Sequence, residues 1–395
     1  MTSPTPLRVA MIGTGFMGRA HSHAWRTAPR FFDLPFSPEL AVIVGRDADR
    51  TAEAASTLGW QESSTDWRAV IERDDIDLVD ICSPGDTHAE IALAAIAAGK
   101  HVLCEKPLAN SVGDAERMTL AAEASAVTAL CGFSYRHTPA LMLARQFIAE
   151  GRLGEIRHVR AQYLQDWLSD AQAPHTWRLD AATAGSGTLG DIGAHSIDTA
   201  QWLTGQRILS VSGTLRTFVT DRPVLAEQVG LGGVAAADAE RRAVTVDDAA
   251  AFTADFDGGA LGVFEATRFA LGRRNANRIE VNGETGSIAF DFERMNELEY
   301  YDGRDPSTAD QGFRRILATD AQHPYAANWW PTGHGLGYEH VFTHQVVDVM
   351  RAIAGENHTT PSFRDALGVQ RVLDAVVASA ASESRRTPVE TGEQE

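Results

Sequence analysis

The sequence predicts a two-domain α/β protein in which a doubly wound parallel sheet is followed by an open antiparallel sheet. Its 395 residues exceed the ~250–300 residues at which a single hydrophobic core stops growing. A glycine-rich turn follows the first predicted strand, and the rhythm of predicted strands changes near Arg157. These three observations place one domain at residues 1–134 and a second at residues 135–395.

The first domain alternates short apolar runs with segments of helical periodicity. The predicted strands are residues 9–12, 40–44, 78–81, 101–104 and 129–131, and the predicted helices are residues 19–27, 49–58, 87–98 and 111–126. Strand and helix in alternation require parallel pairing through crossovers. We therefore predict a doubly wound parallel sheet of the Rossmann type.

The second domain has strands that mostly follow one another without intervening helices, which is typical of an antiparallel sheet. The predicted strands are residues 158–165, 208–217, 250–256, 262–267, 279–282, 287–290 and 298–301. One helix, residues 188–203, interrupts them. A long loop (302–337) precedes helices at 338–354 and 363–381, and the Ala- and Gly-rich segment 222–242 is a predicted surface loop. We expect this domain to bind substrate and to oligomerise, with its last helix packing back on the first domain.

Composition excludes several classes of function. The net charge of -18 repels phosphate backbones and anionic lipid, so we expect neither nucleic acid nor membrane as a partner. The cysteines Cys82, Cys104 and Cys131 lie in apolar runs, which suits reduced thiols rather than a disulfide framework. The first residues lack the features of a signal peptide. We expect a cytoplasmic protein.

A glycine motif lies between the first predicted strand and the first predicted helix. It reads Gly13-Thr-Gly15-Phe16-Met17-Gly18. In this context glycine permits a tight turn and close backbone approach, and the helix N-terminus faces a pyrophosphate. The alternative is a glycine turn without a ligand. We predict a dinucleotide site.

The end of the second predicted strand bears on the choice between NAD and NADP. An NAD-specific site usually offers a carboxylate here to the ribose 2′-hydroxyl, but this chain has Gly45 followed by Arg46 and Asp47. Arg46 suits a 2′-phosphate, whereas Asp47 suits NAD. A plain solvated charge is the alternative for Arg46. We expect either NAD or NADP to bind.

A charged pair, Glu105 and Lys106, follows the fourth main strand and precedes Pro107. Open parallel sheets place ligands at the carboxyl ends of their strands. Pro107 restricts the residue before it, which holds the ammonium of Lys106 in one direction. An ordinary surface lysine is the alternative. The position of Lys106 at the end of a strand and before a proline favours a functional role for its side chain.

Three polar residues share one face of the predicted helix 188–203. Asp191, His195 and Asp198 are spaced i, i+4 and i+7. A solvated stripe is the usual explanation of such a pattern, and a metal site lacks a plausible fourth ligand nearby. The set also suits alcohol oxidation, because hydride leaves a carbinol carbon only as a base removes the hydroxyl proton. His195 is the candidate base.

Taken together, these motifs resemble the Gfo/Idh/MocA oxidoreductase family over nearly the whole chain. The likeness rests on the glycine loop, on Pro84 with His88, on the Glu105-Lys106-Pro107 run and on the segment from Gly187 to Asp198. Further motifs are closest to the levoglucosan and scyllo-inositol dehydrogenase branches. They are Tyr163-Leu-Gln-Asp166-Trp167, Trp177-Arg178 and Glu265-Ala-Thr-Arg268.

The resemblance implies three sets of site residues and no metal. The expected catalytic residues are Lys106, which polarises the reacting oxygen, Asp191, which orients the imidazole or binds a hydroxyl, and His195, the base. The expected cofactor contacts are Gly13, Gly15, Phe16, Met17, Gly18, Arg46, Ser83, Pro84, His88, Glu105, Lys106, Trp177 and Arg178. The expected substrate contacts are Lys106, Tyr135, Arg136, Tyr163, Asp166, Asp191, His195, Asp198, Trp329, Trp330 and His334.

The long loop supplies the aromatic members of that substrate set. Indole rings stack on the apolar faces of sugars, so Trp329 and Trp330 make the loop a candidate lid or wall. The alternative is that they fill a core. His340, His344 and Asp348 have a spacing that suits a metal, but nothing else in the sequence supports one.

The sequence departs from many members of the family that it resembles at Gly85, the residue after Pro84, where they have Asn.

These expectations lead to a main function and two alternatives. The main one is an NAD(P)-dependent oxidoreductase that transfers hydride to or from a ring carbon, C3 by preference, of a sugar, anhydrosugar or cyclitol. The second is an oxidoreductive glycosidase that hydrolyses a glycoside through a transient 3-keto intermediate. The third is a non-catalytic nucleotide-binding sensor. We expect a homodimer or homotetramer formed through an uncovered sheet face.

Overall fold

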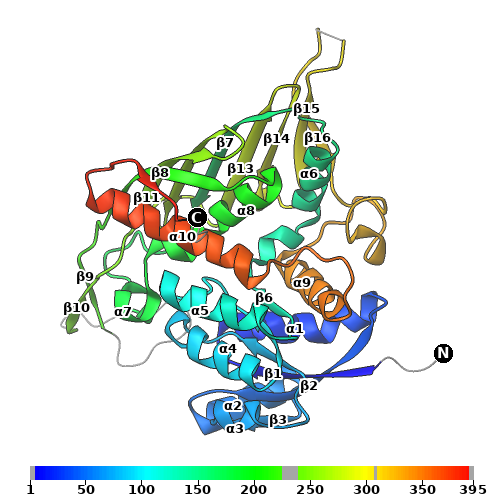
Figure 1. Cartoon of the computed structure of the whole chain (residues 1–395), viewed down its shortest axis with the longest axis vertical. Helices are drawn as coiled ribbons and strands as arrows, with labels where there is room; N and C mark the ends of the chain where they lie inside the picture. Colours follow the sequence, from blue (N-terminus) through cyan, green and yellow to red (C-terminus); the bar gives the residue numbers. More distant parts are fainter. Residues whose placement is uncertain (1–4, 225–238, 307–308, 391–395) are drawn as a thin grey trace. The chain divides into compact units, whose positions relative to one another are not determined.

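The computed structural model describes residues 5–224, 239–306 and 309–390, and the chain forms two compact units. The first unit comprises Met1–Thr138 and Gly337–Leu367, and the second comprises Pro139–Leu336 and Gly368–Glu395. Figure 1 labels helices and strands of both units where there is room. The division departs from our expected boundaries, 1–134 and 135–395, chiefly because a late segment of the chain returns to the first unit.

A six-stranded parallel sheet forms the centre of the first unit. Its order is β3-β2-β1-β4-β5-β6, and every neighbouring pair is parallel. The strands are β1 (Thr5–Ile12), β2 (Phe36–Val44), β3 (Glu62–Ser64), β4 (Leu78–Ile81), β5 (His101–Cys104) and β6 (Ala129–Cys131). The doubly wound sheet is confirmed. Its order reverses between β1 and β4, where such sheets bind ligands.

Helices connect these strands. They are α1 (Phe16–Phe31), α2 (Ala48–Leu58), α3 (Trp67–Ile71), α4 (His88–Ala97) and α5 (Val112–Glu123). All four residues of β4 are buried, as expected for a parallel strand covered on both faces. The sequence prediction omitted β3 and α3, because the three polar residues of β3 offer no apolar run.

The returning segment completes the first unit through α9 (Tyr338–Ile353), which packs against α1. The Tyr338 ring stacks on Phe16 with centroids 6.1 Å apart, and the Phe342 ring lies 5.6 Å from His21. Farther along α9, His344 meets Phe32 edge-on at 5.8 Å. Aromatic packing of this kind depends on residues distant in sequence, so the periodicity that predicted α9 did not reveal its partner.

A nine-stranded mixed sheet dominates the second unit, in the order β16-β15-β14-β13-β7-β12-β11-β8-β17. Its strands are β7 (Ile156–Leu164), β8 (Ile208–Arg216), β11 (Ala249–Phe256), β12 (Leu261–Thr267), β13 (Ala276–Gly283), β14 (Gly286–Asp291), β15 (Glu297–Asp302), β16 (Arg314–Leu317) and β17 (Thr387–Pro388). The sheet is mostly antiparallel, as predicted, but β7 and β12 pair in parallel. The long crossover between them explains this exception.

One face of this sheet carries helices. The second unit contains α6 (Pro139–Ala149), α7 (Ala181–Ala184), α8 (Ala194–Thr204) and most of α10 (Phe363–Ala381), which begins in the first unit. Helix α8 contacts β7, and α6 contacts β15. Along β12, buried residues alternate with exposed ones, among them Leu261 and Val263. The strand therefore has one packed and one exposed side.

Two predicted loops contain regular structure. The loop 302–337 includes β16, so it is not irregular throughout. The segment 222–242 is flanked by β9 (Asp221–Pro223) and β10 (Arg241–Ala243), which pair with each other, while residues 225–238 lie outside the described part of the chain. Among the described residues, no helix has the length and apolar character to cross a membrane.

Candidate active site

The glycine loop between β1 and α1 requires glycine for steric reasons. Gly13 has a φ of +119°, and a Cβ there would lie 2.6 Å from the carbonyl oxygen of Cys82. A Cβ on Gly18 would lie 2.1 Å from the carbonyl oxygen of Gly13. At Gly15, by contrast, none of the described atoms lies within 4 Å of a Cβ position. Gly13 and Gly18 close the turn, and Gly15 leaves space for a ligand.

The N-terminus of α1 faces that space. Gly15 is its N-cap, no described side chain caps it, and its first turn has no acidic residue. The first turn carries Phe16 and Met17, and Phe16 is 57% exposed. Uncapped backbone N–H groups at a helix N-terminus suit an anion such as a pyrophosphate.

The second strand ends at a position where a carboxylate has no room. A Cβ on Gly45 would lie 2.3 Å from Thr51 Oγ1 and 3.1 Å from Thr14 Cγ2. The carboxylate of Asp47 accepts the Arg50 backbone N–H at 2.9 Å and so caps α2. Arg46 is exposed. Asp47 is therefore engaged in helix capping although it is exposed, and Arg46 is an accessible cation at this corner.

The loops that follow β4 and β5 are tied together by His88. Its Nε2 lies 2.9 Å from the carbonyl oxygen of Ser83 and its Nδ1 lies 3.0 Å from that of Pro107. The side chain is buried, so it acts from inside the unit. Pro84, the residue between Ser83 and Gly85, is the N-cap of the short turn leading into α4.

The space beside Gly85 is filled by an amide side chain from another loop. A Cβ on Gly85 would lie 2.6 Å from Asn110 Oδ1. The side chain of Asn110 thus fills the space that a larger residue at 85 would need. Sequence reasoning missed Asn110 because the two positions are 25 residues apart, and no periodicity links them.

Glu105 and Lys106 follow β5 directly. Glu105 is 4% exposed, and its Oε2 accepts the backbone N–H of Lys106 at 3.3 Å. Its Oε1 lies 3.2 Å from Nε2 of His21. The carboxylate of Glu105 is therefore engaged within the first unit, whereas Lys106 is half-buried. Tyr135 and Arg136, two further predicted residues, are buried in a short helical turn that follows β6.

In the second unit, the predicted helix 188–203 is two segments. Leu189–Gly193 forms a π-helical turn, and α8 follows it. Asp191 lies in the turn, while His195 and Asp198 lie on α8, where they are 7% and 2% exposed. A residue far away in sequence holds this turn, because the Asp247 carboxylate accepts the backbone N–H groups of Gly187 and Leu189, both at 2.8 Å. Sequence reasoning missed Asp247.

Asp191 is held by a buried arginine. Arg268, at the end of β12 and 1% exposed, donates from Nη2 to Asp191 Oδ2 at 2.8 Å and to the Gly187 carbonyl at 3.1 Å. Its guanidinium lies 5.4 Å from the ring centroid of Trp167. We predicted that Asp191 orients His195, and the structure adds Arg268 as the side chain that fixes Asp191.

His195 is flanked by Tyr163 of β7. Their ring centroids are 5.9 Å apart, and the Tyr163 hydroxyl donates to Asn275 Oδ1 at 2.7 Å. Gln165 donates to the same oxygen at 3.0 Å and accepts from Trp167 Nε1 at 3.0 Å. Tyr163 thus lies beside the imidazole, and its hydroxyl is held by a hydrogen-bonded group that includes Asn275 and Gln165. Asn275 lies outside every motif, and no sequence signal identified it.

Other predicted substrate residues of the second unit make contacts of their own. Asp166 accepts from the backbone of Gly272 at 3.1 Å and from Arg274 at 3.0 Å. In the long loop, Trp330 is 47% exposed and its ring centroid is 6.3 Å from that of Trp329. His334 is exposed, and its Nδ1 lies 2.8 Å from the Pro331 carbonyl oxygen.

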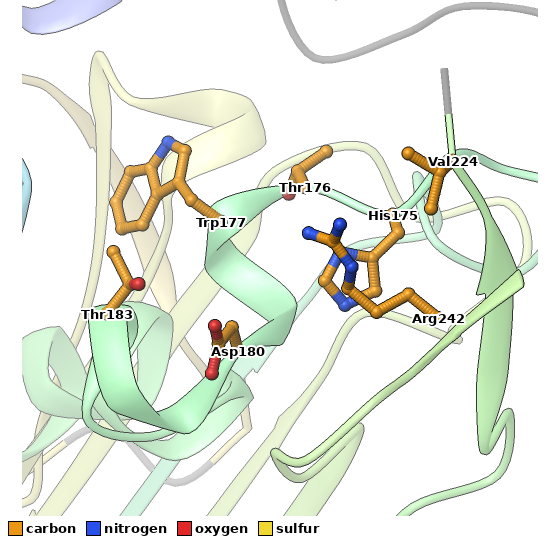
Figure 2. Close-up of a pocket in the computed structure, with 7 residues that line it drawn as sticks. All are labelled: His175, Thr176, Trp177, Asp180, Thr183, Val224 and Arg242. Carbon is orange, nitrogen blue, oxygen red and sulfur yellow. The ribbon is translucent and has the colours of Figure 1, made fainter. Parts of the chain in front are cut away.

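Trp177 lines a cavity of about 280 Å³, and Arg178 is the next residue along the chain. The Arg178 guanidinium stacks on the Trp177 ring, 4.4 Å from its centroid. Burial lowers the pKa of Arg178, and the nearby Asp191 carboxylate opposes that shift. Figure 2 draws the lining residues His175, Thr176, Trp177, Asp180, Thr183, Val224 and Arg242. Arg178, a predicted cofactor residue, is therefore close enough to Asp191 for their charges to interact, and it stacks on Trp177, the other predicted cofactor residue of this segment.

Comparison with known proteins decides the family. Residues 7–133 match the model of an oxidoreductase family with an NAD-binding Rossmann fold, and residues 141–289 match that of the GFO/IDH/MocA C-terminal domain. The chain belongs to the Gfo/Idh/MocA oxidoreductase family. It is 41% identical over 381 residues to levoglucosan dehydrogenase of Pseudarthrobacter phenanthrenivorans, covering 96% of this chain and 97% of that protein.

Solved structures of Gfo/Idh/MocA oxidoreductases have the same architecture. A crystal structure of an oxidoreductase domain protein from Kribbella flavida is 58% identical, with a TM-score of 0.92, and covers 98% of this chain and 100% of its own. Levoglucosan dehydrogenase in complex with NADH and levoglucosan is 40% identical, with a TM-score of 0.91 and the same two coverages. The first unit of our chain is thus an NAD-binding Rossmann domain.

The residues of this Gfo/Idh/MocA oxidoreductase fit the dinucleotide. Gly15 leaves open space next to the first turn of α1, whose N–H groups no described side chain caps. A pyrophosphate placed there would be held by backbone donors and by the helix dipole. The pyrophosphate would be held by backbone N–H groups. The residues that follow β2 therefore bear only on whether the ribose carries a 2′-hydroxyl or a 2′-phosphate.

Proposed function

We propose that this oxidoreductase transfers a hydride between NAD(P) and a ring carbon of a sugar, anhydrosugar or cyclitol, with C3 of a pyranose as the preferred position. The observation that carries the proposal is that His195 lies beside Tyr163, while Asp191, four residues earlier in the chain, is held by the buried Arg268. The 41% identity to levoglucosan dehydrogenase supports a carbohydrate substrate. A sensor would not need this arrangement.

In the proposed reaction, His195 is the general base that takes the hydroxyl proton as the carbinol is oxidised. Lys106 donates from its ammonium to the same oxygen and stabilises its alkoxide form. Asp191, fixed by Arg268, orients the imidazole or accepts from a neighbouring hydroxyl. The nicotinamide of bound NAD(P) supplies the hydride acceptor.

We propose that cofactor and substrate contacts divide as follows. The glycine loop holds the pyrophosphate, and Trp177 with Arg178 contacts the cofactor from the second unit. His88 and Glu105, both buried, support the loops behind it. Tyr163, Asp166, Asp198 and the long-loop residues Trp329, Trp330 and His334 contact the sugar, together with Tyr135 and Arg136. Stacking on indole and hydrogen bonds to hydroxyls are the expected interactions.

We also propose that both NAD and NADP bind, because Gly45 leaves no carboxylate to repel a 2′-phosphate and Arg46 is accessible. Replacing Arg46 by Ala should weaken NADP several-fold and leave NAD unchanged. Titration of each cofactor measures this. A preference for NAD above about a hundredfold, nearly 3 kcal/mol, in the parent protein would contradict the role of Arg46.

A panel of sugars, anhydrosugars, cyclitols and aryl glycosides tests the function. Reduction of NAD by a sugar or cyclitol, with the product identified as the 3-keto compound, supports the dehydrogenase. Release of the aglycone without net cofactor reduction indicates the glycosidase instead. No turnover with any compound, while NADH binds normally, would contradict both. Lys106→Ala should reduce turnover by roughly 10²–10³.

We propose that the second unit forms a homodimer or homotetramer through the exposed side of its sheet. Leu261 and Val263 of β12 are 47% and 42% exposed, an apolar pair on an outward strand face. Light scattering of the parent protein and of Val263→Asp gives the oligomeric state. A parent protein that is monomeric at micromolar concentration would contradict this.

A further inference from the structure

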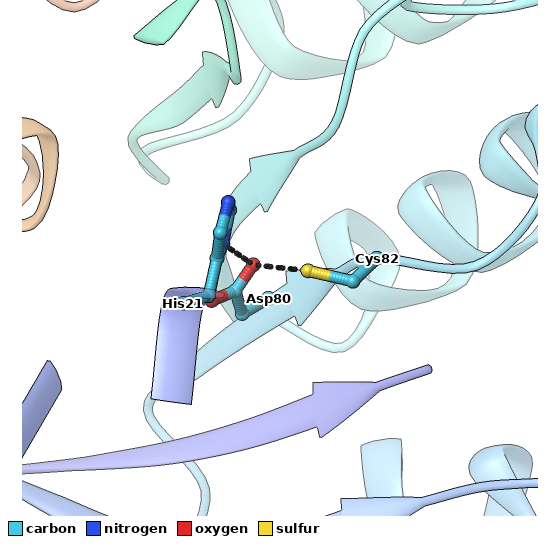
Figure 3. A group of neighbouring side chains, drawn as sticks. All are labelled: His21, Asp80 and Cys82. Carbon is cyan, nitrogen blue, oxygen red and sulfur yellow. Dashed lines mark hydrogen bonds and ion pairs between the residues drawn. The ribbon is translucent and has the colours of Figure 1, made fainter. Parts of the chain in front are cut away.

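A buried histidine of α1 faces two carboxylates, neither of which takes part in the proton or hydride transfer proposed above. His21 is 1% exposed, Asp80 of β4 is 0% exposed and Glu105 after β5 is 4% exposed. Nδ1 of His21 lies 3.0 Å from both oxygens of Asp80, and Nε2 lies 3.2 Å from Glu105 Oε1. Each ring nitrogen of His21 therefore meets a carboxylate oxygen (Figure 3 draws the Asp80 side).

This geometry favours the doubly protonated ring. A neutral imidazole has one N–H donor, so its other nitrogen would present a lone pair to a carboxylate. Burial alone lowers the pKa of His21, but the Asp80 carboxylate raises it, and the result is a pKa well above the usual value. The other groups near the ring are uncharged: the Cys82 thiol, whose pKa burial raises, and the ring of Phe342 on α9.

The same three residues also resemble a metal site. His21, Asp80 and Cys82 each offer a ligand atom, and these atoms lie within 4.8 Å of one another. A metal would need the Cys82 thiolate, which burial disfavours. Moreover, Asp80 already accepts from Trp25 Nε1 at 2.8 Å and faces His21 with both oxygens. The contacts fit an ion pair better than a coordination sphere.

The cluster is connected to Lys106 through Glu105. Oε2 of Glu105 accepts the Lys106 backbone N–H, and the Glu105 N–H donates to the Ile81 carbonyl at 2.9 Å. On its other side the carboxylate lies against Gly132, where a Cβ would be only 2.5 Å from Oε1. The Glu105 side chain is thus confined between His21 and Gly132, and it fixes the backbone that carries Lys106.

We propose that His21, as an imidazolium between Asp80 and Glu105, is a positioning residue for Lys106. The inference rests on the proposed function, in which Lys106 stabilises the alkoxide. Without the cation, two buried carboxylates would face a neutral side chain, and an uncompensated buried charge is strongly unfavourable. Glu105 would then shift or take up a proton, and the ammonium of Lys106 would lose its alignment. The link also joins the glycine-loop helix to the Glu-Lys-Pro strand end.

The test compares His21→Gln with the double variant His21→Gln/Asp80→Asn. We expect His21→Gln to lower kcat about tenfold or more while the Kd for NADH changes less than about threefold. The double variant carries one carboxylate fewer beside the neutral side chain, so it should regain activity.

Two controls keep the outcomes distinct. His344→Gln removes another buried histidine of the same unit, one that faces a backbone carbonyl rather than a carboxylate, and should leave kcat and its pH profile unchanged. Lys106→Ala reports on the proposed function itself. If Lys106→Ala retains turnover, the proposed function of Lys106 is wrong. If Lys106→Ala is inactive but His21→Gln is within about twofold of the parent at every pH, only the inference about His21 fails.

Three further results would overturn the inference. One is an equal loss of kcat in His344→Gln, and the second is a loss in His21→Gln that Asp80→Asn does not relieve, because either indicates general destabilisation. The third is a stoichiometric metal in the purified parent protein that His21→Gln lacks. NMR titration of the His21 ring gives a readout independent of activity, and it should find both nitrogens protonated at pH 7.

Discussion

The two units build their parts of the site in different ways. In the first unit, the predicted ligand contacts are backbone amides and the ends of adjacent parallel strands, and Gly18 is fixed by a contact within its own turn, while Gly13 also lies against Cys82 after the neighbouring strand β4. In the second, His195 depends on side chains from separate strands, among them Tyr163 and Asn275, which are 112 residues apart. Short motifs can therefore specify the first unit's site, whereas the second unit's site exists only after long-range folding.

The largest expected effect separates the units by function. His195→Ala removes the proposed base, so kcat should fall by roughly 10²–10⁴. NADH affinity should not change, because the glycine loop belongs to the first unit. Steady-state kinetics and a fluorescence titration with NADH measure the two quantities. Turnover close to that of the parent protein would remove the assignment of the base.

A second variant breaks the long-range network of the second unit. Arg268→Met removes the buried cation that holds Asp191, and we expect kcat to fall about 10–100-fold with a loss of stability of about 3 kcal/mol. Arg268→Lys keeps the charge but not the two-point geometry, and should be intermediate.

Arg160→Met serves as the matched control for Arg268. Arg160 forms a half-exposed pair with Glu280 at 3.2 Å, and such pairs contribute little to stability. Kinetics and urea unfolding of the three variants give both effects. Equal behaviour of Arg268→Met and Arg160→Met would show that Arg268 does not support the site.

The pH dependence of stability tests the first unit separately. Burial lowers the pKa of His137 to about 4 and that of His344 to about 3. Below the unfolded pKa of about 6.5, the unfolded chain binds protons that the native state excludes, so stability falls as pH drops from about 6.5 toward 4. His137 alone accounts for about 3 kcal/mol over that range.

The control for this prediction is His344→Gln, which should have a shallower loss of stability at acid pH than the parent. His21 has the opposite effect on how stability depends on pH. Its raised pKa contributes stability that is present below about pH 6.5 and is lost as pH rises through the folded value. Denaturant unfolding between pH 4.5 and pH 9 measures both trends. If the free energy of unfolding of the parent protein did not fall at acid pH, the role of His137 and His344 would be contradicted.

The smallest expected effect concerns the open space at Gly15. Gly15→Ala should leave the free energy of unfolding nearly unchanged, because the new methyl group meets no described atom within 4 Å. If the cofactor occupies that space, NADH affinity should fall about tenfold, roughly 1.4 kcal/mol. Gly113→Ala, a position in α5 that is equally open, is the control. It should leave NADH affinity unchanged and raise the free energy of unfolding by up to about 1 kcal/mol, because Ala favours a helix over Gly. Unchanged NADH affinity in Gly15→Ala would contradict the placement of the cofactor.

The sequence predicted what local patterns encode. Strands β4, β5 and β6 match the predicted bounds residue for residue, because short apolar runs between turns are unambiguous in a parallel sheet. Sequence position and the family resemblance both pointed to His195 and Lys106 as catalytic residues, and these roles stay predictions. Neither pointed to Asn110, Asp247 or Asn275, since each acts through contacts with residues far away in sequence.

The π-helical turn before α8 illustrates the same limit. Periodicity predicted one helix over 188–203, but two hydrogen bonds from Asp247 rearrange its beginning. The parallel pairing of β7 with β12 was missed for a related reason. Strand direction in a mixed sheet depends on the path of the connections, and apolar alternation is the same for both directions.

The return of Gly337–Leu367 to the first unit has a consequence for biosynthesis. Until α9 has been translated, the aromatic side of α1 has no covering helix, and the Cys131 N–H lacks the Pro361 carbonyl that it meets at 2.8 Å in the finished protein. A ribosome must therefore produce almost the whole second unit before the Rossmann domain can close. Residues 1–138 expressed alone should be aggregation-prone, whereas a fragment that also carries residues 337–367 through a short linker should remain soluble.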